Sequence, residues 1–568
     1  MKKRRILAGI MAAVLAAGTL AGCGKGGESG SGSKTEGGSA GGEKVFNYSY
    51  NSVVVGLNPI LNTSAPDNVA HNIICDPLVR NAKKADNTTE IIPAAAETWE
   101  SSEDGRTYTF HLHEDAKWND GEPLTAQDFE YTLKLMADPD TAAVNAWLFD
   151  GVIENFGEAL YSKDGKTAED IGVKAVDDTT LEIKITHPAS YFTELASSVY
   201  PVRQDKYEEW GEAYGSSADK IICSGPFEVE SWSQNTEFVA KKNENYWDAE
   251  NVKLDKIVMK VIQEPATAIQ AFINQEIDVV ATSDPNWAEQ IEAANMSTTE
   301  IVPDSAPEFL MFNMENEYLA NTKIRQALSA AFDRQEFVDT LRDGKALPIY
   351  SVMPDTMLIG DKSYTELVDG KNYFVKELQE EVKDPKALLE EGLKEIGKPA
   401  DASQVTLHYA SRGTNELSKK MAEWYKQIWE AELGITLEID MMEWNVMWDK
   451  IDAGDYEIAV GGWGPYYNEP SAILMLFDPD TGYFNADKLG WNNEDSKKFK
   501  ELCESATNIV DEKEKAEIYL QAEELLVKNA VIVPEYLEQS PYFVANTVKN
   551  YFVSTNGMTN WAEVDVEK

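Results

Sequence analysis

The chain has 568 residues, of which 26% are charged, and a formal net charge of −47 at pH 7. A protein this acidic repels nucleic acid and gains no attraction to an anionic membrane surface. The charge favours solubility and is also compatible with a cationic ligand. The four cysteines are distant from one another and show no Cys-x-x-Cys spacing, which argues against a disulfide framework or a zinc cluster. The length suffices for two or three domains with substantial cores.

The N-terminus has the pattern of an export signal. Residues 2–5 are basic, and residues 6–20 are apolar but too few for a comfortable membrane span. The motif Leu20-Ala-Gly-Cys23 resembles the lipobox of bacterial lipoproteins, and this resemblance implies a lipid on Cys23. We expect a signal peptide over residues 1–22 and a lipidated, flexible glycine- and serine-rich linker over residues 23–44. The alternative is an ordinary cleaved secretory signal.

Periodicity in the body of the chain predicts mixed α/β structure. Alternating apolar residues indicate half-buried strands at 108–112, 181–185, 257–261, 405–409 and 435–439. Between the last two, apolar residues repeat at helical spacing, namely Leu417, Met421, Trp424, Ile428 and Leu433. Such a strand–helix–strand unit favours a parallel strand pair. Further helices are predicted from Asp384, as N-cap before Pro385, and over residues 321–334.

The segment from Gly461 to Ile473 has the composition of a binding loop. It follows a predicted strand at residues 456–460, and its glycines at 461, 462 and 464 leave space for a close approach to the backbone. It also carries aromatic and polar side chains, namely Trp463, Tyr466, Tyr467, Asn468 and Glu469. Exposed main-chain groups between aromatic walls can grip an extended ligand by strand addition. The alternative is an ordinary aromatic-rich loop.

Other groups of polar residues do not form a catalytic or metal-binding motif. His111 and His113 share a face of a predicted strand but have no third ligand nearby. Asp478 and Asp480 precede a glycine that comes one position too early for an EF-hand loop. The sequence has no nucleophile elbow and no zinc-protease motif, and no pair of carboxylates stands out as acid and base. We therefore expect neither catalysis nor a metal or other cofactor.

Ten short motifs, in a fixed order, resemble the solute-binding lipoproteins of ATP-driven peptide importers, the oligopeptide- and dipeptide-binding family (bacterial extracellular solute-binding family 5). The resemblance covers nearly the whole chain after the linker. The motifs are Gly56-Leu-Asn-Pro59, Ile74-Cys-Asp-Pro-Leu78, Pro93-Ala-Ala-Ala-Glu-Thr-Trp99, Ser102-Glu-Asp-Gly-Arg-Thr-Tyr-Thr-Phe-His-Leu112, Lys117-Trp-Asn-Asp-Gly-Glu-Pro-Leu-Thr-Ala-Gln-Asp-Phe129, Gly172-Val-Lys-Ala-Val-Asp-Asp-Thr-Thr-Leu181, Ser224-Gly-Pro-Phe227, Asn243-Glu-Asn-Tyr-Trp247, Gln275-Glu-Ile-Asp278 and Asn313-Met-Glu-Asn316, the last with Ile324-Arg-Gln-Ala-Leu328 and Asp333-Arg334.

This resemblance implies a two-lobed α/β clamp of the periplasmic-binding type, with an additional domain inserted in the first lobe. Lobe one would comprise residues 45–62, 178–305 and 535–568, the inserted domain residues 63–177, and lobe two residues 306–534. Two crossover strands, near residues 302–304 and 533–535, would form the hinge, and each contains a proline that limits bending. The lobes would close around a ligand and present a shape that the permease recognises.

The resemblance also implies site residues. The segment around Gly462, Trp463 and Gly464 would pair with the ligand main chain, Ser64 and Ala65 would pair from the other lobe, and Trp444 would wall a side-chain pocket. The family pattern has an aspartate, which binds the α-ammonium of the peptide, at the position of Tyr466. Here either Glu469 or another carboxylate replaces it, or the ligand has no free α-amino group. Asn468 adds a polar group beside this position.

Three functions follow as hypotheses. The first is a lipid-anchored, monomeric receptor at the outer face of the cytoplasmic membrane, or in the periplasmic space, that delivers peptides to an import permease. The second is the same role for another ligand, such as an oligosaccharide or an amino-blocked peptide, for which the 14 tryptophans would suit sugar stacking. The third is a surface glycoside hydrolase with paired carboxylates.

Overall fold

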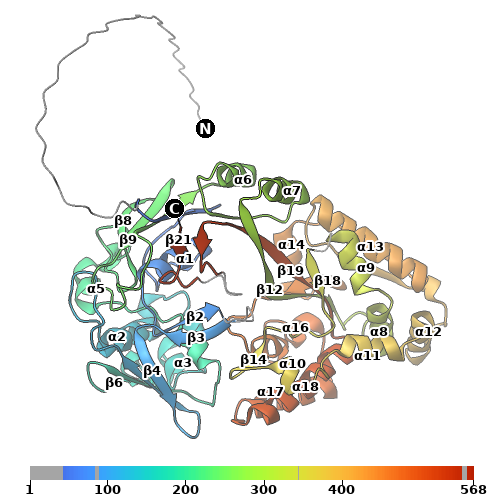
Figure 1. Cartoon of the computed structure of the whole chain (residues 1–568). Helices are drawn as coiled ribbons and strands as arrows, with labels where there is room; N and C mark the ends of the chain where they lie inside the picture. Colours follow the sequence, from blue (N-terminus) through green and yellow to red (C-terminus); the bar gives the residue numbers. More distant parts are fainter. Residues whose placement is uncertain (1–41, 84–88, 343–344, 553–558, 568) are drawn as a thin grey trace, which may run out of the picture. The chain divides into compact units, whose positions relative to one another are not determined.

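The computed structural model describes residues 42–83, 89–342, 345–552 and 559–567. Packing divides the chain into the units Met1–Gly42 and Glu43–Lys568, and the described helices and strands belong to the second unit, the body (Figure 1). The predicted signal peptide, Cys23 and most of the predicted linker lie outside the described residues. The body combines helices with several sheets, as the sequence predicts.

One sheet joins the start of the body to residues more than 170 positions further along the chain. Its strands lie in the order β1 (Val45–Tyr50), β10 (Lys256–Val261), β9 (Glu237–Lys242), β8 (Phe227–Ser233), and helix α1 (Ala65–Ile74) packs against β8 and β9. β1 is parallel to β10, with Phe46 opposite Ile257. Both side chains are fully buried, because alternate residues of each strand face the core.

A second sheet is antiparallel, with the order β4 (Ala96–Ser101), β5 (Thr107–Leu112), β7 (Thr180–Lys184), β6 (Val173–Ala175). Helix α2 (Ala126–Ala137) packs against β6 and β7. Phe110 of β5 lies opposite Leu181 of β7, and both are fully buried. The predicted boundary between residues 177 and 178 falls inside this sheet, because β7, which follows the boundary, pairs with β5 and β6, which precede it. The division of the chain into lobes stays a prediction.

The largest sheet has seven strands and contains β12 (Ser297–Phe312) and β19 (Ile532–Ala545), which pair antiparallel along most of their length (Figure 1). β11 (Val279–Ala281) and β13 (Ala346–Pro348) each pair with β19. The largest apolar core contains residues 46–279 and 544–566, whereas two further cores lie within residues 309–536. β12 and β19 therefore connect two halves that have separate cores.

The two predicted crossings lie on these strands but not opposite each other. Pro303 is opposite Gln539, whereas Pro534 is opposite Phe309. The register shifts between Pro303 and Pro307, where each proline lacks the N–H that a regular ladder requires. The part of β19 that lies level with residues 302–303 is thus residues 539–540, beyond the predicted 533–535. The hinge itself stays a prediction.

The predicted strand–helix–strand unit is confirmed. β16 (Thr406–Ala410) and β17 (Thr436–Asp440) are parallel and are joined by α13 (Glu416–Glu432). β18 (Ile458–Gly462), which follows helix α14 (Trp444–Asp452), is parallel to β16 and antiparallel to β12. Met421, Tyr425 and Trp429 of α13 are buried against this sheet's apolar core. Burial of one face of α13 thus holds the helix against the sheet, as the apolar spacing of its residues predicts.

The predicted helix starts are also observed. Asp384 caps α12 (Pro385–Glu395) by accepting a hydrogen bond from the Ala387 N–H. The predicted helix at 321–334 is α8 (Thr322–Ala330), capped by Asn321, and a separate helix, α9 (Arg334–Leu341), begins after the cap residue Asp333. Further helices of this half include α17 (Glu494–Ala506) and α18 (Glu512–Lys528), which pack together. In the described part of the chain, no helix combines the length and the apolar composition that a membrane span requires.

Candidate functional site

Three loops that follow parallel strands meet at one edge of the largest sheet. Because β16, β17 and β18 are parallel, their carboxyl ends lie at the same edge. The loops that leave this edge comprise residues 411–415, 441–443 and 463–470. Ligands of open α/β sheets commonly bind at this edge. The predicted residues Trp444, Trp463 and Tyr466 all come from these loops or directly follow them.

The edge of β18 is open at this place. β18 pairs with β16 only at Ile458 and Ala459, so no described strand lies beside residues 460–462 on that side. Among the described residues, no backbone hydrogen bond involves the N–H or C=O of Trp463 or Gly464. Unpaired main-chain groups at the end of a central strand can accept an additional, extended chain. The segment therefore has the main-chain geometry that the sequence predicts for strand addition.

The glycines of this segment serve a different purpose from the predicted one. β18 continues through Gly461 and Gly462, where the sequence predicts an irregular loop. A Cβ atom on Gly461 would lie 2.7 Å from the Phe309 ring, and one on Gly462 would lie 2.9 Å from the Glu308 carboxyl carbon. These glycines therefore make room for side chains of β12. Only Gly464, whose Cβ would lie 4.0 Å from Ala306, borders open space.

Aromatic side chains form a pocket on one side of Gly464. The Trp463 and Tyr466 ring centroids are 6.3 Å apart, and Tyr466 meets Trp147 of the short helix η2 (Ala146–Phe149) edge-on at 4.5 Å. Tyr466 and Trp147 remain 53% and 44% exposed, respectively. The cavity measures about 390 Å³, and we call it the aromatic pocket; its walls include Trp147, Tyr191, Trp463, Tyr466, Tyr467 and Tyr483.

A charged pair that the sequence did not predict lies beside Gly462. Arg412, two residues after β16, donates from Nη1 to the Glu308 carboxylate, and its guanidinium lies 5.0 Å from the centre of the Trp444 ring. Glu308 is buried, whereas the Arg412 side chain is 33% exposed. Arg412 and Trp444 line an open cavity of about 500 Å³ with residues 413–415 and Glu443. The position of Arg412 after a parallel strand was the available signal for its role.

Glu469 lies in the interior. Its carboxylate is 3.5 Å from Lys515 Nζ, and both side chains are almost completely buried. Hydroxyl groups of Ser471 and Tyr519 also donate to Glu469. Burial raises the pKa of Glu469 above its usual range, and these three partners oppose the shift. Glu469 therefore has its own cationic partner within the chain and is not placed to replace a carboxylate at Tyr466.

Asn468 and Tyr467 connect the loop after β18 to residues 191–194. Asn468 donates from its backbone N–H and its side-chain amide to the Glu194 carboxylate, at 2.7 and 2.9 Å. The Tyr467 ring stacks on Tyr191 at 3.9 Å. Lys515 Nζ donates to the Pro188 carbonyl at 3.3 Å. Burial raises the pKa of Glu194 to about 7, although the two Asn468 hydrogen bonds lower it. Residues 187–194 and the loop formed by residues 463–470 are thus held together.

Ser64 and Ala65 lie at the other predicted contact. Ser64 is the N-cap of α1 and bonds with the Asp67 side chain, while Ala65 is the first residue of the helix; both are exposed. Among the described residues, no contact joins this pair to the loop formed by residues 463–470. Their predicted pairing with a ligand stays a prediction. The predicted lipidation of Cys23 likewise lies outside the described residues.

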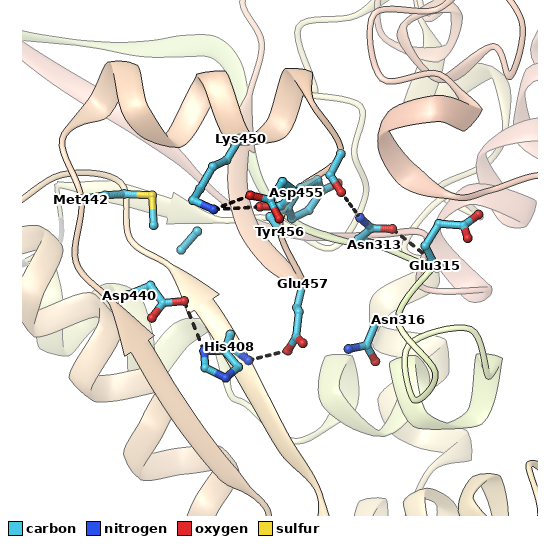
Figure 2. A pocket seen from close by; sticks show the side chains of 12 residues that line it. Asn313, Glu315, Asn316, His408, Asp440, Met442, Lys450, Asp455, Tyr456 and Glu457 are labelled. Atoms are coloured by element: carbon cyan, nitrogen blue, oxygen red, sulfur yellow. Dashed lines mark hydrogen bonds and ion pairs between the residues drawn. The ribbon is translucent and has the colours of Figure 1, made fainter.

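A second hollow, of about 350 Å³, lies near the opposite end of β18, beside Tyr456 and Glu457 (Figure 2). Several of its polar side chains contact one another: Lys450 contacts Asp455, and His408 Nδ1 lies 3.2 Å from Asp440. None of the predicted site residues lines it. Across the described residues, no cluster of three His, Cys, Asp or Glu side chains is arranged to hold a metal. The strip from Trp444 to the aromatic pocket is therefore the better candidate site.

Comparison with known proteins identifies the class of protein. The family model "Bacterial extracellular solute-binding proteins, family 5 Middle" matches residues 90–485. The oligopeptide-binding protein OppA of Bacillus subtilis (strain 168) is 31% identical over 472 residues, which cover 81% of this chain and 82% of OppA. The chain therefore belongs to the family 5 bacterial extracellular solute-binding proteins.

Solved structures agree on the fold. Listeria monocytogenes OppA bound to peptide matches with a TM-score of 0.66 and 27% identity, covering 93% of this chain and all of that chain. An unliganded, open form of the murein tripeptide-binding protein MppA matches with a TM-score of 0.74 and 23% identity, covering 93% and 98%. The body thus has the two-lobed α/β clamp fold that the sequence predicts, and the family places the protein outside the cytoplasm.

Proposed function

We propose that this protein is a receptor that captures peptides between its two lobes and delivers them to an ATP-driven import permease. The observation that carries the proposal is the open edge of β18, where Trp463 and Gly464 present unpaired main-chain groups between aromatic walls. An extended peptide pairs with such an edge through its own main chain, which gives affinity for many sequences. The relative named as an oligopeptide-binding protein and the peptide-bound neighbour support this assignment.

Arg412 provides a place for one end of such a ligand. The guanidinium has five N–H donors, and the described contacts use one of them, for Glu308. The remaining donors border the open cavity beside Trp444. Charge-assisted hydrogen bonds from arginine to a carboxylate are strong and directional. We assign the cavity beside Arg412 to the carboxylate end of the peptide.

The proposal includes the location and the mode of action. Cys23 carries the lipid that holds the protein at the membrane, and the linker lets the body move above the surface. The body acts by binding and closing, without covalent chemistry, and as a monomer. Family membership supports a binding role, and the N-terminal sequence motif supports the lipid anchor.

A thermal-shift screen tests the proposal with three ligand sets: peptides of two to six residues, N-acetylated peptides, and oligosaccharides. A ligand at a hundred times its dissociation constant stabilises the bound state by about 2.7 kcal/mol, which is easily detected. We expect peptides to stabilise the protein and oligosaccharides to have no effect. Stabilisation by oligosaccharides alone would contradict the proposal and support the second hypothesis.

The control for main-chain pairing is Gly464→Ala. The added methyl group borders open space in the free protein, since the nearest atom would be 4.0 Å away. It therefore leaves the melting temperature of the free protein unchanged but stands where the ligand backbone would lie. We expect weaker stabilisation by every peptide in the panel. An unchanged response would show that ligands do not pair at this edge.

A further inference from the structure

The exposed rings of the aromatic pocket stand at steep angles to one another. The Tyr466 ring makes an angle of 82° with the Trp147 ring and of 72° with the Trp463 ring. Trp147 and Tyr466 keep 44% and 53% of their surface exposed, and the cavity of about 390 Å³ has room for a long side chain. The face of such a ring attracts a cation that lies within about 6 Å of the ring centre. The walls of the pocket are therefore suited to a positively charged group.

Three ionisable residues other than tyrosines border the pocket, and two of them carry no free positive charge. Lys515 Nζ lies 3.5 Å from the buried Glu469 carboxylate and donates to the Pro188 carbonyl, and its side chain is 4% exposed. Burial, together with the charges of Lys515 and Arg106, lowers the pKa of His187 to about 4, so the His187 ring is neutral at pH 7. Arg106 itself does not border the pocket. A ligand cation thus meets no uncompensated positive charge on the residues that line the cavity.

The third ionisable residue is Asp150, which is exposed and directly follows the short helix η2 that carries Trp147. Its Oδ1 lies beside Gly157, and the Tyr161 hydroxyl donates to the same carboxylate. An ionised carboxylate accepts about four hydrogen bonds, so acceptor positions remain. Lys163, which lies over the Tyr161 ring, does not border the pocket. Within the described parts of the chain, no lysine or arginine forms an ion pair with Asp150, which therefore gives the pocket an uncompensated negative charge.

We propose that the aromatic pocket binds a cationic group of the ligand, an ammonium or a guanidinium, which pairs with Asp150 and lies among the rings of Trp147, Trp463 and Tyr466. The inference rests on the proposed function, because it makes the receptor selective for peptides that carry such a group. An α-amino group and a lysine or arginine side chain present the same chemistry to the pocket. The net charge of −47 also attracts cationic ligands toward the protein.

The carboxylate and the rings act on a cation in different ways. Removing water from an ammonium is costly unless a counter-ion compensates the loss, and Asp150 is that counter-ion. The rings contact the methylene groups that carry the charge and attract the charge itself through their faces. An uncharged group gains only the apolar contact with the rings. Cationic ligands should therefore bind more tightly than uncharged ligands of the same size.

The test uses three pools of pentapeptides with free carboxyl ends. The first pool has a free α-amino group and no lysine or arginine. The second is N-acetylated and has one lysine at a varied position, and the third differs from the second only in that norleucine replaces the lysine. The full-length protein is incubated with equal concentrations of the pools, and the bound peptides are counted by mass spectrometry.

We expect the first or the second pool to be enriched over the third by at least about tenfold, which corresponds to about 1.4 kcal/mol. Enrichment of the first pool assigns the cation to the α-amino group, and enrichment of the second assigns it to a side chain. Equal binding of the three pools, or enrichment of the third, overturns the inference while supporting a peptide receptor. If no pool binds, the proposed function fails as well.

The variant Asp150→Asn removes the negative charge and keeps an acceptor for the Tyr161 hydroxyl. Asp115→Asn is the matched control, because Asp115 is exposed, does not border the pocket and makes the same change in net charge. Since both positions are exposed, we expect both variants to fold, and their melting temperatures check this. Asp150→Asn should reduce the enrichment of the cationic pool by at least about fivefold, whereas Asp115→Asn should leave it unchanged. Equal enrichment in the two variants would overturn the inference.

Discussion

The site has two ion pairs, and they differ in what surrounds them. Glu308–Arg412 borders an open cavity, and the guanidinium is 33% exposed. Glu469–Lys515 is sealed, with 1% and 4% of the side chains exposed. Arg412 retains donors for a ligand, whereas Lys515 is engaged by Glu469 and by the Pro188 carbonyl. The two pairs thus differ in whether the cation keeps exposed donors or is enclosed by partners within the chain.

The difference teaches that the exposure of the cation, and not the presence of an ion pair, decides whether donors remain for a ligand. Both pairs sit beside loops that follow parallel strands, and both cations border a cavity, but the Arg412 side chain is 33% exposed whereas the Lys515 side chain is only 4% exposed. At the aromatic end, the carboxylates Glu194 and Glu469 are both turned toward partners within the chain. The four predictions that follow test this contrast.

The largest effect is expected from Lys515→Met. It leaves the Glu469 carboxylate buried without a counter-ion, and breaking a buried pair in this way costs about 3–5 kcal/mol. Denaturant unfolding measures the loss of stability. The control is Lys500→Met, which breaks an exposed pair with Asp480 and should change stability little. A similar, small effect of both variants would contradict the structural role of Lys515.

Gly462→Ala should have the second largest effect. The new methyl group would lie 2.9 Å from the Glu308 carboxyl carbon, so the buried Glu308 carboxylate, which Arg412 holds in place, must shift. We expect a loss of about 1–3 kcal/mol in unfolding free energy, the usual cost of overpacking. Gly464→Ala is the matched control, with no close neighbour and no expected loss. Equal stability of the two variants would exclude the close contact between Gly462 and Glu308.

Arg412→Gln tests the charged end of the site. We expect the dissociation constant of peptides with a free carboxyl end to rise by about ten- to a hundredfold, because a charge-assisted hydrogen bond contributes about 1.5–3 kcal/mol. Binding of the same peptides as C-terminal amides should change less. Lys450→Gln, in the hollow of Figure 2, makes the same change of charge away from the site and should leave both affinities unaltered. Isothermal titration calorimetry measures the four values.

The smallest effect concerns pH. Burial raises the pKa of Glu535, near Arg412, to about 8 and that of Glu194, at the aromatic end, to about 7. Between the usual glutamate pKa and these values the folded state binds more protons than the unfolded state, so stability increases as the pH falls. We expect the melting temperature to rise by a few degrees between about pH 8.5 and pH 6.5.

Glu535→Gln checks the origin of this pH dependence, because the amide can still accept the Tyr425 hydroxyl but does not titrate. In this variant, the change of the melting temperature with pH should be smaller. An unchanged slope would assign the effect to other groups. Below about pH 6.5 the buried His71, whose pKa burial lowers to about 4, acts in the opposite direction, so the measurement stays above that pH.

Local patterns in the sequence determined most of the secondary structure that surrounds the site. The parallel unit β16–α13–β17 follows from apolar spacing, and the caps Asp384 and Asn321 follow from side-chain chemistry. The aromatic loop after β18 was also recognisable, because Trp463 and Tyr466 follow a predicted strand. These features depend on residues a few positions apart, so a single sequence contains the information.

Tertiary structure alone decided which groups the site contains. Gly462 leaves space for the Glu308 side chain, and Glu469 is buried in an ion pair with Lys515. The residues in these contacts are 154 and 46 positions apart in the sequence. Arg412 became a site residue only because Glu308 and Trp444 lie beside it. The sequence determined that the protein has an aromatic, strand-ending loop of a family 5 binding protein. Whether a carboxylate of that loop faces a ligand or the interior depends on distant partners, since burial and charge pairing act through space.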